Sequence, residues 1–209
     1  MSDSGDHRIG AEDRGRADAY ALLSRLFYAA PDAALLEALR GQPKADDGGL
    51  ELVEITPAGY PAALAALQQA ARTSEAAALQ TEYDELFIGA GRAAVTPYTS
   101  GYTTPASPDR HLVALREQLT AWGLVRRDAA YEVEDHVSAV CDVMRWLIEH
   151  DRPVEVQMQF FDEFVFRGVE TFCDAIDSSA ATAFYRAVAN LARTFIMVES
   201  EAFALHGGK

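Results

Sequence analysis

Hydrophobic residues recur every three or four positions along most of this chain, which is the period of an amphipathic α-helix. The first stripe predicts a helix over 16–29 and consists of Ala19, Leu22, Leu23, Leu26 and Phe27. A short helix ending at Leu39 follows. The same period predicts helices over 61–71, 75–88, 107–122, 134–150, 154–167, 169–177 and 179–205.

Polar, proline and glycine residues mark where these helices begin and end. Ser74 is expected to cap the helix over 75–88, and Ser107 with Pro108 to begin the next. Gly123 and Gly168 are expected to end helices. We therefore predict one all-α bundle of about eight or nine helices.

Strand signals are weak, and the domain limits follow from the helical pattern. Residues 50–56 alternate briefly before Pro57, and we interpret them as an irregular connection. The polar run 41–49 is the most linker-like stretch. Residues 1–15 are expected to form a disordered tail, and 16–206 the single helical domain.

Charge limits the kinds of partner that the chain can bind. Lys and Arg total 18 against 32 Asp and Glu, a net charge of −14. That balance argues against binding the phosphate backbone of nucleic acid, so a charged partner is expected to be cationic. Solubility is the simpler explanation of the acidity.

Cysteine usage and hydropathy bear on compartment. Cys141 and Cys173 lie far apart among apolar residues, without metal-site or redox-motif spacing, and are expected in the core. The polar N-terminus has no apolar run typical of a secretory signal, and no segment approaches the ~20 apolar residues that span a bilayer. We expect a cytoplasmic protein without a membrane span.

Motifs of enzyme and metal chemistry are missing from the sequence. None of the five histidines has an acid three residues before it, as di-metal bundles require, and neither H-E-x-x-H nor G-x-S-x-G occurs. Glu82 and Glu85 have a spacing that could share a cation, but a solvated helix face explains them better. We expect no enzyme activity, cofactor or metal.

A glycine-rich stretch, Gly89-Ala90-Gly91 followed by Ala94, fits the G-x-G-x-x-A spacing of dinucleotide sites. That fingerprint requires a strand before it, whereas the preceding stripe has helical spacing, and Pro97 disfavours a following helix. We therefore predict a helix end followed by an extended loop. A guanine-nucleotide-binding regulator stays open as an alternative.

The start of the helix over 134–150 combines acids with a histidine. Glu132, Glu134 and Asp135 stand where negative charge meets the positive end of the helix dipole. His136 lies at the edge of the apolar stripe in the expected first turn. There we expect a neutral, partly buried imidazole.

Together these segments resemble the TorD/DmsD/NarJ family of redox-enzyme maturation chaperones. The family's E-x-x-x-L-F-x-G-P-G…P-P-Y-x-S-x-Y segment is matched by Glu82, Leu86, Phe87, Gly89, Gly91, Pro97, Tyr98, Ser100 and Tyr102. Its P-x-D-H element is matched by Asp135 and His136. Ala90, Thr96 and Val133 depart from family prolines, and the aromatic pattern of the last helices is also similar.

The resemblance implies a chaperone that binds the twin-arginine leader of a molybdenum-cofactor oxidoreductase until cofactor insertion and folding are complete. Its client would be of the DMSO/TMAO reductase, nitrate reductase or formate dehydrogenase type, and the client body is a further candidate ligand. The matched residues and Glu134 would form the peptide site, with acids meeting the arginines and Leu86, Tyr98 and Tyr102 lining an apolar groove.

Two features of this interpretation stay open. A helical scaffold that binds another basic protein is an alternative to leader binding. The chain is expected to be a monomer or a dimer swapped about a hinge at 103–109.

Overall fold

The computed structural model of the chain describes residues 9–41, 59–89, 93–124 and 133–207. In these residues α- and π-helical segments join into nine continuous helices, and Tyr98 and His136 form an isolated β-bridge. The segments are α1 (Ala11–Tyr28), α2 (Ala33–Arg40), α3 (Tyr60–Arg72), α4 (Ala76–Tyr83), η1 (Asp84–Ile88), α5 (Ser100–Thr103), α6 (Pro108–Ala121), α7 (Val137–Glu149), α8 (Val154–Phe160), η2 (Phe161–Val165), α9 (Phe166–Asp177) and α10 (Ala183–Gly207). The predicted all-α fold is confirmed.

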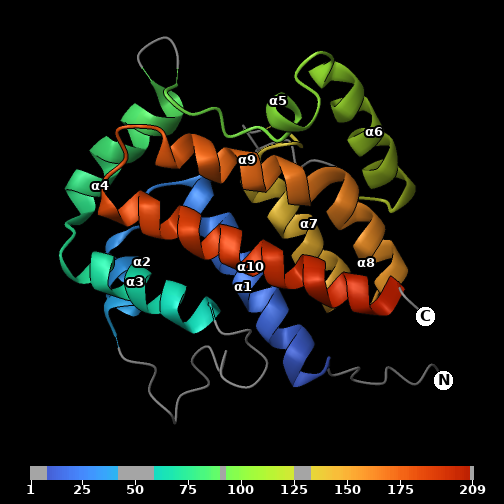
Figure 1. Cartoon of the computed structure of the whole chain (residues 1–209), viewed down its shortest axis with the longest axis horizontal. Helices are drawn as coiled ribbons and strands as arrows, with labels where there is room; N and C mark the ends of the chain where they lie inside the picture. Colours follow the sequence, from blue (N-terminus) through green and yellow to red (C-terminus); the bar gives the residue numbers. More distant parts are fainter. Residues whose placement is uncertain (1–8, 42–58, 90–92, 125–132, 208–209) are drawn as a thin grey trace.

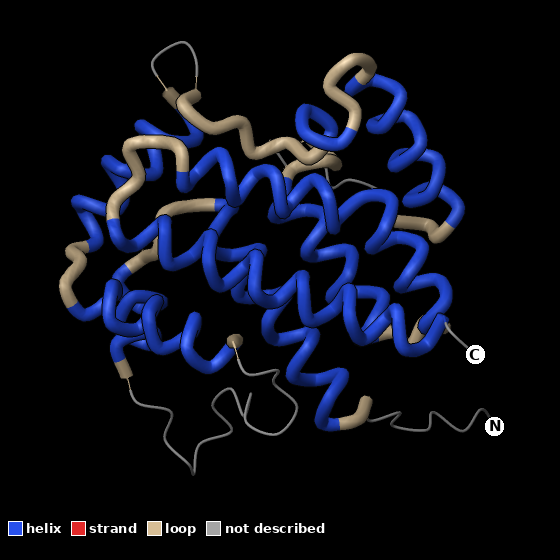
Figure 2. Tube along the Cα trace, viewed as in Figure 1, coloured by secondary structure: helices blue, strands red, loops and turns tan. Residues whose placement is uncertain are grey.

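The helices pack around the long α10, which crosses the molecule beside α9 (Figure 1). α1 packs most extensively against α7, and α10 against α9 and α3. α5 and α6 project at one corner of the molecule (Figure 1). Helices joined by loops make up the described residues (Figure 2). No helix of the described residues is long and apolar enough to cross a bilayer.

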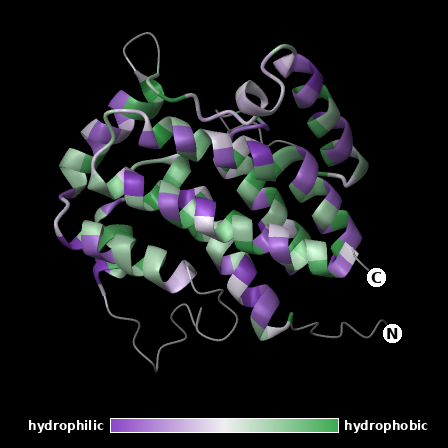
Figure 3. Ribbon diagram, viewed as in Figure 1, coloured by the Kyte–Doolittle hydropathy of each residue, from purple (hydrophilic) through white to green (hydrophobic). Residues whose placement is uncertain are grey.

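Aromatic rings dominate the buried centre. Apolar and polar residues are interspersed along each helix at short intervals, as in amphipathic helices that bury one face (Figure 3). Each fully buried large side chain contributes about 1.5–3 kcal/mol of transfer free energy. The aromatic residues that are almost completely buried are Tyr20, Phe27, Phe160, Phe161, Phe164, Phe172, Phe184 and Tyr185.

Several predicted helix ends are confirmed. Pro108 is the first residue of α6, with Ser107 at the cap position, and Gly123 follows the helix with a φ of 72°. η1 ends at Ile88, and Gly89 has a φ of 63°. Positive φ is the conformation that favours glycine, so these two residues turn the chain out of their helices.

Other predicted ends are wrong. α1 begins at Ala11, so 11–15 belong to a helix and not to a disordered tail. Ser74 does not cap α4, because its hydroxyl donates to the Ala70 carbonyl at 2.8 Å and Glu75 takes the cap position. Gly168 lies inside α9 instead of ending a helix. The predicted linker beyond Gly41 and the stretch 50–56 fall outside the described residues.

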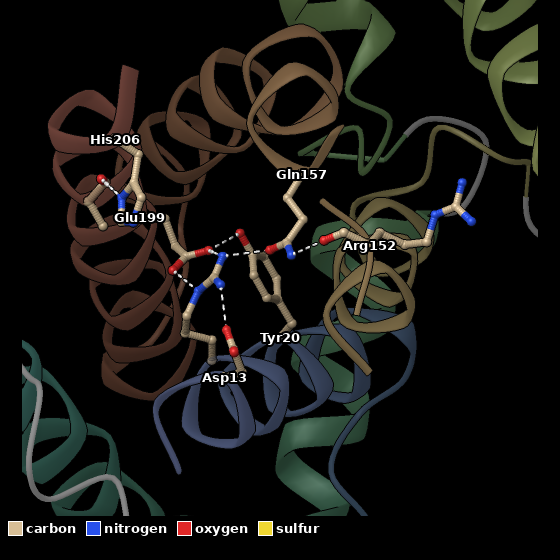
Figure 4. Close-up of polar contacts among 8 residues, drawn as sticks. Asp13, Tyr20, Arg152, Gln157, Glu199 and His206 are labelled. Carbon is tan, nitrogen blue, oxygen red and sulfur yellow. Dashed lines mark hydrogen bonds and ion pairs between the residues drawn. The ribbon is translucent and has the colours of Figure 1, made fainter. Parts of the chain in front are cut away.

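A buried ion pair joins the two ends of the described fold (Figure 4). Arg16 of α1 donates to both carboxylate oxygens of Glu199 on α10, at 2.7 and 2.9 Å. Tyr20 donates to the same carboxylate at 3.1 Å, and Gln157 of α8 accepts from Arg16 at 3.0 Å. Helices α1, α8 and α10 are thereby connected through one polar cluster.

Candidate functional site

The two sequence elements that resemble the chaperone family lie side by side. Tyr98 and His136 form an antiparallel bridge. On either side of it, the Thr99 amide donates to the Asp135 carbonyl and the Val137 amide to the Pro97 carbonyl, both at 2.9 Å. Residues 97–99 and 135–137 thus form one backbone-paired unit, which we call the joint.

Asp135 is the buried centre of the joint. Its carbonyl also accepts from the Thr99 hydroxyl at 3.1 Å, and its carboxylate accepts from the Ser100 amide at 3.4 Å. Because Asp135 is only 3% exposed, its side chain faces the protein's own groups. It holds the turn after Tyr98 in place and is not open to solvent.

His136 caps α7 and does not lie in its first turn, which corrects the predicted start of that helix. α7 begins at Val137, and Nδ1 of His136 accepts from the Ser138 amide at 3.2 Å. A ring nitrogen that accepts a backbone N–H is unprotonated, which fits the expected neutral imidazole. The ring is 2% exposed, more buried than expected, and meets Tyr98 edge-on with centroids 5.5 Å apart.

Glu134 is the acid of this region that solvent reaches. Its side chain is 17% exposed, and Oε2 accepts from Nε and Nη2 of Arg116 on α6 at 3.1 and 3.0 Å. Glu132, the other predicted acid, lies outside the described residues.

A second histidine lies beside the joint. His111 of α6 has Nε2 3.5 Å from the Thr99 hydroxyl, and its ring contacts Phe164 edge-on. Burial lowers the pKa of His111, although the charges of Asp135 and Glu163 act in the opposite direction. The exposed Glu163 is therefore close enough to add negative charge to this side of the molecule.

Two hydrogen bonds hold the loop before the joint in place. Tyr102 donates to the Thr96 carbonyl at 2.7 Å, and the Val95 amide donates to the Leu86 carbonyl at 2.8 Å. Burial raises the pKa of Tyr102 to about 12, so its hydroxyl keeps its proton at neutral pH. Tyr98 and Tyr102 are both half-buried.

The first residues of the matched segment are built into the core. Leu86 was predicted to line an open groove, but Leu86 and Phe87 are both buried. Glu82 accepts from the amide and hydroxyl of Thr182 at 2.6 and 2.7 Å, immediately before α10. Gly89 turns the chain out of η1, and Gly91 falls outside the described residues.

The described residues around the joint give no metal cluster. No group of three or more His, Cys, Asp or Glu within the described ranges could hold a metal ion. Glu82 is buried and bound to Thr182, so the predicted solvated face is wrong for Glu82, whereas Glu85 is exposed. Shallow depressions of the described surface lie on α6 and between α1 and α7, and no predicted site residue lines either.

Sequence reasoning missed four residues that position the site: Thr99, His111, Arg116 and Gly168. Thr99 lies within the matched segment, and its hydroxyl at a predicted turn was an available signal. The other three lie on α6 and α9, and no pattern in the sequence relates them to the joint.

Gly168→Ala is expected to loosen the joint. A Cβ at this position would lie 2.7 Å from Cβ of Thr99 and 3.0 Å from Oγ1 of Thr103, so α9 or the turn must move. Overpacking costs about 1–3 kcal/mol, against about 1 kcal/mol gained in helix propensity. We expect urea denaturation to show a net loss of up to about 2 kcal/mol, and we expect faster hydrogen exchange of the Thr99 amide.

Gly101→Ala is the matched control, because a Cβ there meets nothing within 4 Å. Unchanged protection of the Thr99 amide in Gly168→Ala would contradict the close approach of α9 to the turn.

Comparison with known proteins adds to this geometry. The nitrate reductase delta subunit family matches residues 55–174, a range that includes both halves of the joint. A chaperone protein TorD from Actinobacillus pleuropneumoniae serotype 7 is 26% identical over 164 residues, covering 78% of this chain and 75% of that protein. The TorD of serotype 3 is 26% identical over 119 residues, covering 56% and 60%.

A solved structure has the same fold. A redox enzyme maturation protein from Archaeoglobus fulgidus superposes with a TM-score of 0.52 at 17% identity, covering 94% of this chain and 99% of that one. At this identity the likeness concerns the fold alone.

Proposed function

Because the chain belongs to the nitrate reductase delta subunit family, we propose that it is a non-catalytic, cytoplasmic maturation chaperone for a molybdenum-cofactor oxidoreductase. Its ligand is the client's twin-arginine leader, which it holds until cofactor insertion and folding are complete. The curated relatives named as TorD chaperones support the chaperone role. The observation that supports the proposed site is the joint, which holds Tyr98 against His136 and has Glu134 next to it along the chain.

In this proposal the eleven predicted residues that the structure describes divide into three groups by burial and position. Glu134, Tyr98 and Tyr102 contact the guest, because solvent reaches them. Asp135, His136, Pro97 and Ser100 are buried and act as positioning residues for the joint. Glu82, Leu86, Phe87 and Gly89 anchor the loop to the core, and Gly91 lies outside the described residues.

Charge and hydrogen-bond geometry favour arginine as the group recognised at Glu134. A guanidinium donates to a carboxylate through two N–H groups, and each charge-assisted bond contributes about 1.5–3 kcal/mol. The exposed Glu163 adds negative charge for the neighbouring arginine. The net charge of −14 raises the local concentration of a basic leader.

The apolar run of the leader is assigned to the surface of Tyr98 and Tyr102. Both rings are half-buried, which leaves apolar edges exposed next to a polar hydroxyl. Such a surface accepts apolar side chains while the acids hold the arginines. The client stays defined by class: a DMSO/TMAO reductase, nitrate reductase or formate dehydrogenase type.

Isothermal titration calorimetry with a synthetic twin-arginine leader tests the proposal. We expect the leader to bind, Glu134→Gln to weaken binding by about 10- to 100-fold, and higher salt to weaken it as well. A leader with both arginines replaced by lysine is expected to bind less tightly, because an ammonium cannot donate as a planar fork.

Glu201→Gln is the control, since it makes the same change in net charge at an exposed position of α10. Equal affinity for the arginine and lysine leaders would favour a scaffold for basic proteins. No heat with any molybdoenzyme leader, together with heat on adding GTP, would favour the nucleotide-binding alternative.

A further inference from the structure

The carboxylate assigned to the leader already holds an arginine of this chain. Arg116 of α6 donates from Nε and Nη2 to Oε2 of Glu134, at 3.1 and 3.0 Å. The pair spans 18 residues of sequence and lies beside the joint. The bound group is chemically the one that a leader arginine would supply.

Exposure shows which partner of this pair can leave. The Arg116 side chain is 49% exposed, whereas that of Glu134 is 17% exposed. Arg116 can therefore turn into solvent, while the carboxylate stays next to the joint. An exposed ion pair of this kind contributes about 0.2–1 kcal/mol, which a well-placed guest can exceed.

α6 does not depend on the ion pair for its place in the fold. Its inner face contacts the α8–η2 helix through His111 against Phe164 and through Trp122 against Phe160, with centroids 5.3 and 5.6 Å apart. Leu115 is fully buried on the same face. Arg116 can thus change rotamer while α6 remains docked beside α5, at the corner seen in Figure 1.

We propose that Arg116 is an internal competitor that occupies the arginine-binding carboxylate of the empty chaperone and that the leader displaces. This inference rests on the proposed function and identifies a residue that determines its specificity. Because Arg116 is tethered next to Glu134, its effective concentration there is on the order of millimolar. A peptide that binds Glu134 must displace Arg116, and this competition lowers the affinity that is measured for the peptide.

Competition of this kind selects for more than one arginine. A guest guanidinium at Glu134 must first displace Arg116, so a guest with a single arginine gains less from this contact than it would without Arg116. A twin-arginine leader gains from the contacts that Arg116 cannot make: the second arginine and the apolar run against Tyr98 and Tyr102. Arg116 therefore rejects ordinary basic segments, which is specificity gained by weakening the wrong partner.

Arg116→Ala tests the competition, with Arg110→Ala as its control. Arg110 is exposed on the same helix, and its removal changes the net charge equally. By calorimetry we expect Arg116→Ala to bind the twin-arginine leader about two- to fivefold more tightly than Arg110→Ala. A leader with one arginine replaced by alanine should gain at least as much affinity from Arg116→Ala. The ratio of the affinities for the two-arginine and one-arginine leaders should therefore not rise in that variant.

Arg116→Lys provides a second variant that keeps the charge. Its affinity for the leader is expected between those of the wild-type protein and Arg116→Ala, because an ammonium competes for Glu134 less well than a planar guanidinium. In spectra of the protein labelled with ¹⁵N-arginine, the Arg116 Nε–H signal should shift on addition of leader.

The outcomes separate this inference from the proposed function. If the wild-type protein binds the leader but Arg116→Ala binds it no more tightly than Arg110→Ala does, the competition is overturned. Arg116 would then have no effect on binding or would hold Glu134 in place for the guest. Failure of the wild-type protein and both alanine variants to bind any leader overturns the proposed function itself.

Discussion

Glu199→Ala is expected to lower the free energy of unfolding by about 3 kcal/mol, because it leaves the largely buried Arg16 guanidinium with the half-exposed Asp13 as its remaining counter-charge. Glu199 is 2% exposed and receives hydrogen bonds from Arg16 and Tyr20. Burial alone would lower the pKa of Arg16, but the hydrogen bonds and charge of Glu199 raise it above its ordinary value. Arg16 therefore keeps its positive charge in the folded protein.

Urea denaturation followed by circular dichroism measures this effect. Glu201→Ala, two residues along α10 and exposed, should change stability by less than about 0.5 kcal/mol. The double variant Arg16→Met with Glu199→Leu should lose less than Glu199→Ala, because it removes both charges from the interior. A loss below about 1 kcal/mol for Glu199→Ala would show that α1 and α10 do not depend on the pair.

Phe172→Ala is expected to cost about 3–5 kcal/mol and to loosen the joint more than its surroundings. The ring is fully buried and lies between Phe27, Phe87 and Tyr102, with centroids 5.0, 5.9 and 6.1 Å away. It is thus the residue through which α1, η1 and the Tyr98–Tyr102 turn share one packing centre. Removing it leaves a cavity against all three.

Native-state hydrogen exchange distinguishes this local effect from a general loss of stability. In Phe172→Ala the Thr99 and Val137 amides, which bond across the joint, should lose more protection than the global change accounts for. Phe184→Ala is the control: that ring is equally buried but packs edge-on against Tyr185. If the two variants expose the joint equally, Phe172 does not support it specifically. Phe172→Leu should recover most of the stability, at a cost below about 1.5 kcal/mol.

The local chemistry of the chain made most of the helices predictable. Pro108 at the start of α6 and Gly123 after its end act through neighbours in sequence, so their effect is readable without a fold. One prediction failed at a position where a distant residue lies close. Gly168 was expected to end a helix, but it lies inside α9. Its missing side chain leaves room for Thr99 to approach this helix.

The π-helical turns η1 and η2 show the same limit. Both lie in segments whose period predicts α-helix, and their apolar residues are buried as that period requires. The extra residue in each turn alters which side chains face the core, and η1 delivers the chain to the positive φ of Gly89. Sequence periodicity does not resolve such a single-residue change.

By itself, the sequence determined that this chain is an all-α bundle with an acidic surface, and it named both halves of the joint. The fold class and the charge follow from hydrophobic period, net charge and local turn residues, which act over a few positions. The two halves of the joint were identified through the resemblance to the chaperone family. Only the tertiary structure decided that Asp135 and His136 are buried supports, that Leu86 belongs to the core, and that Arg116 occupies Glu134. Burial and ion pairing depend on which helices meet, and helices far apart in the chain meet only in the folded protein.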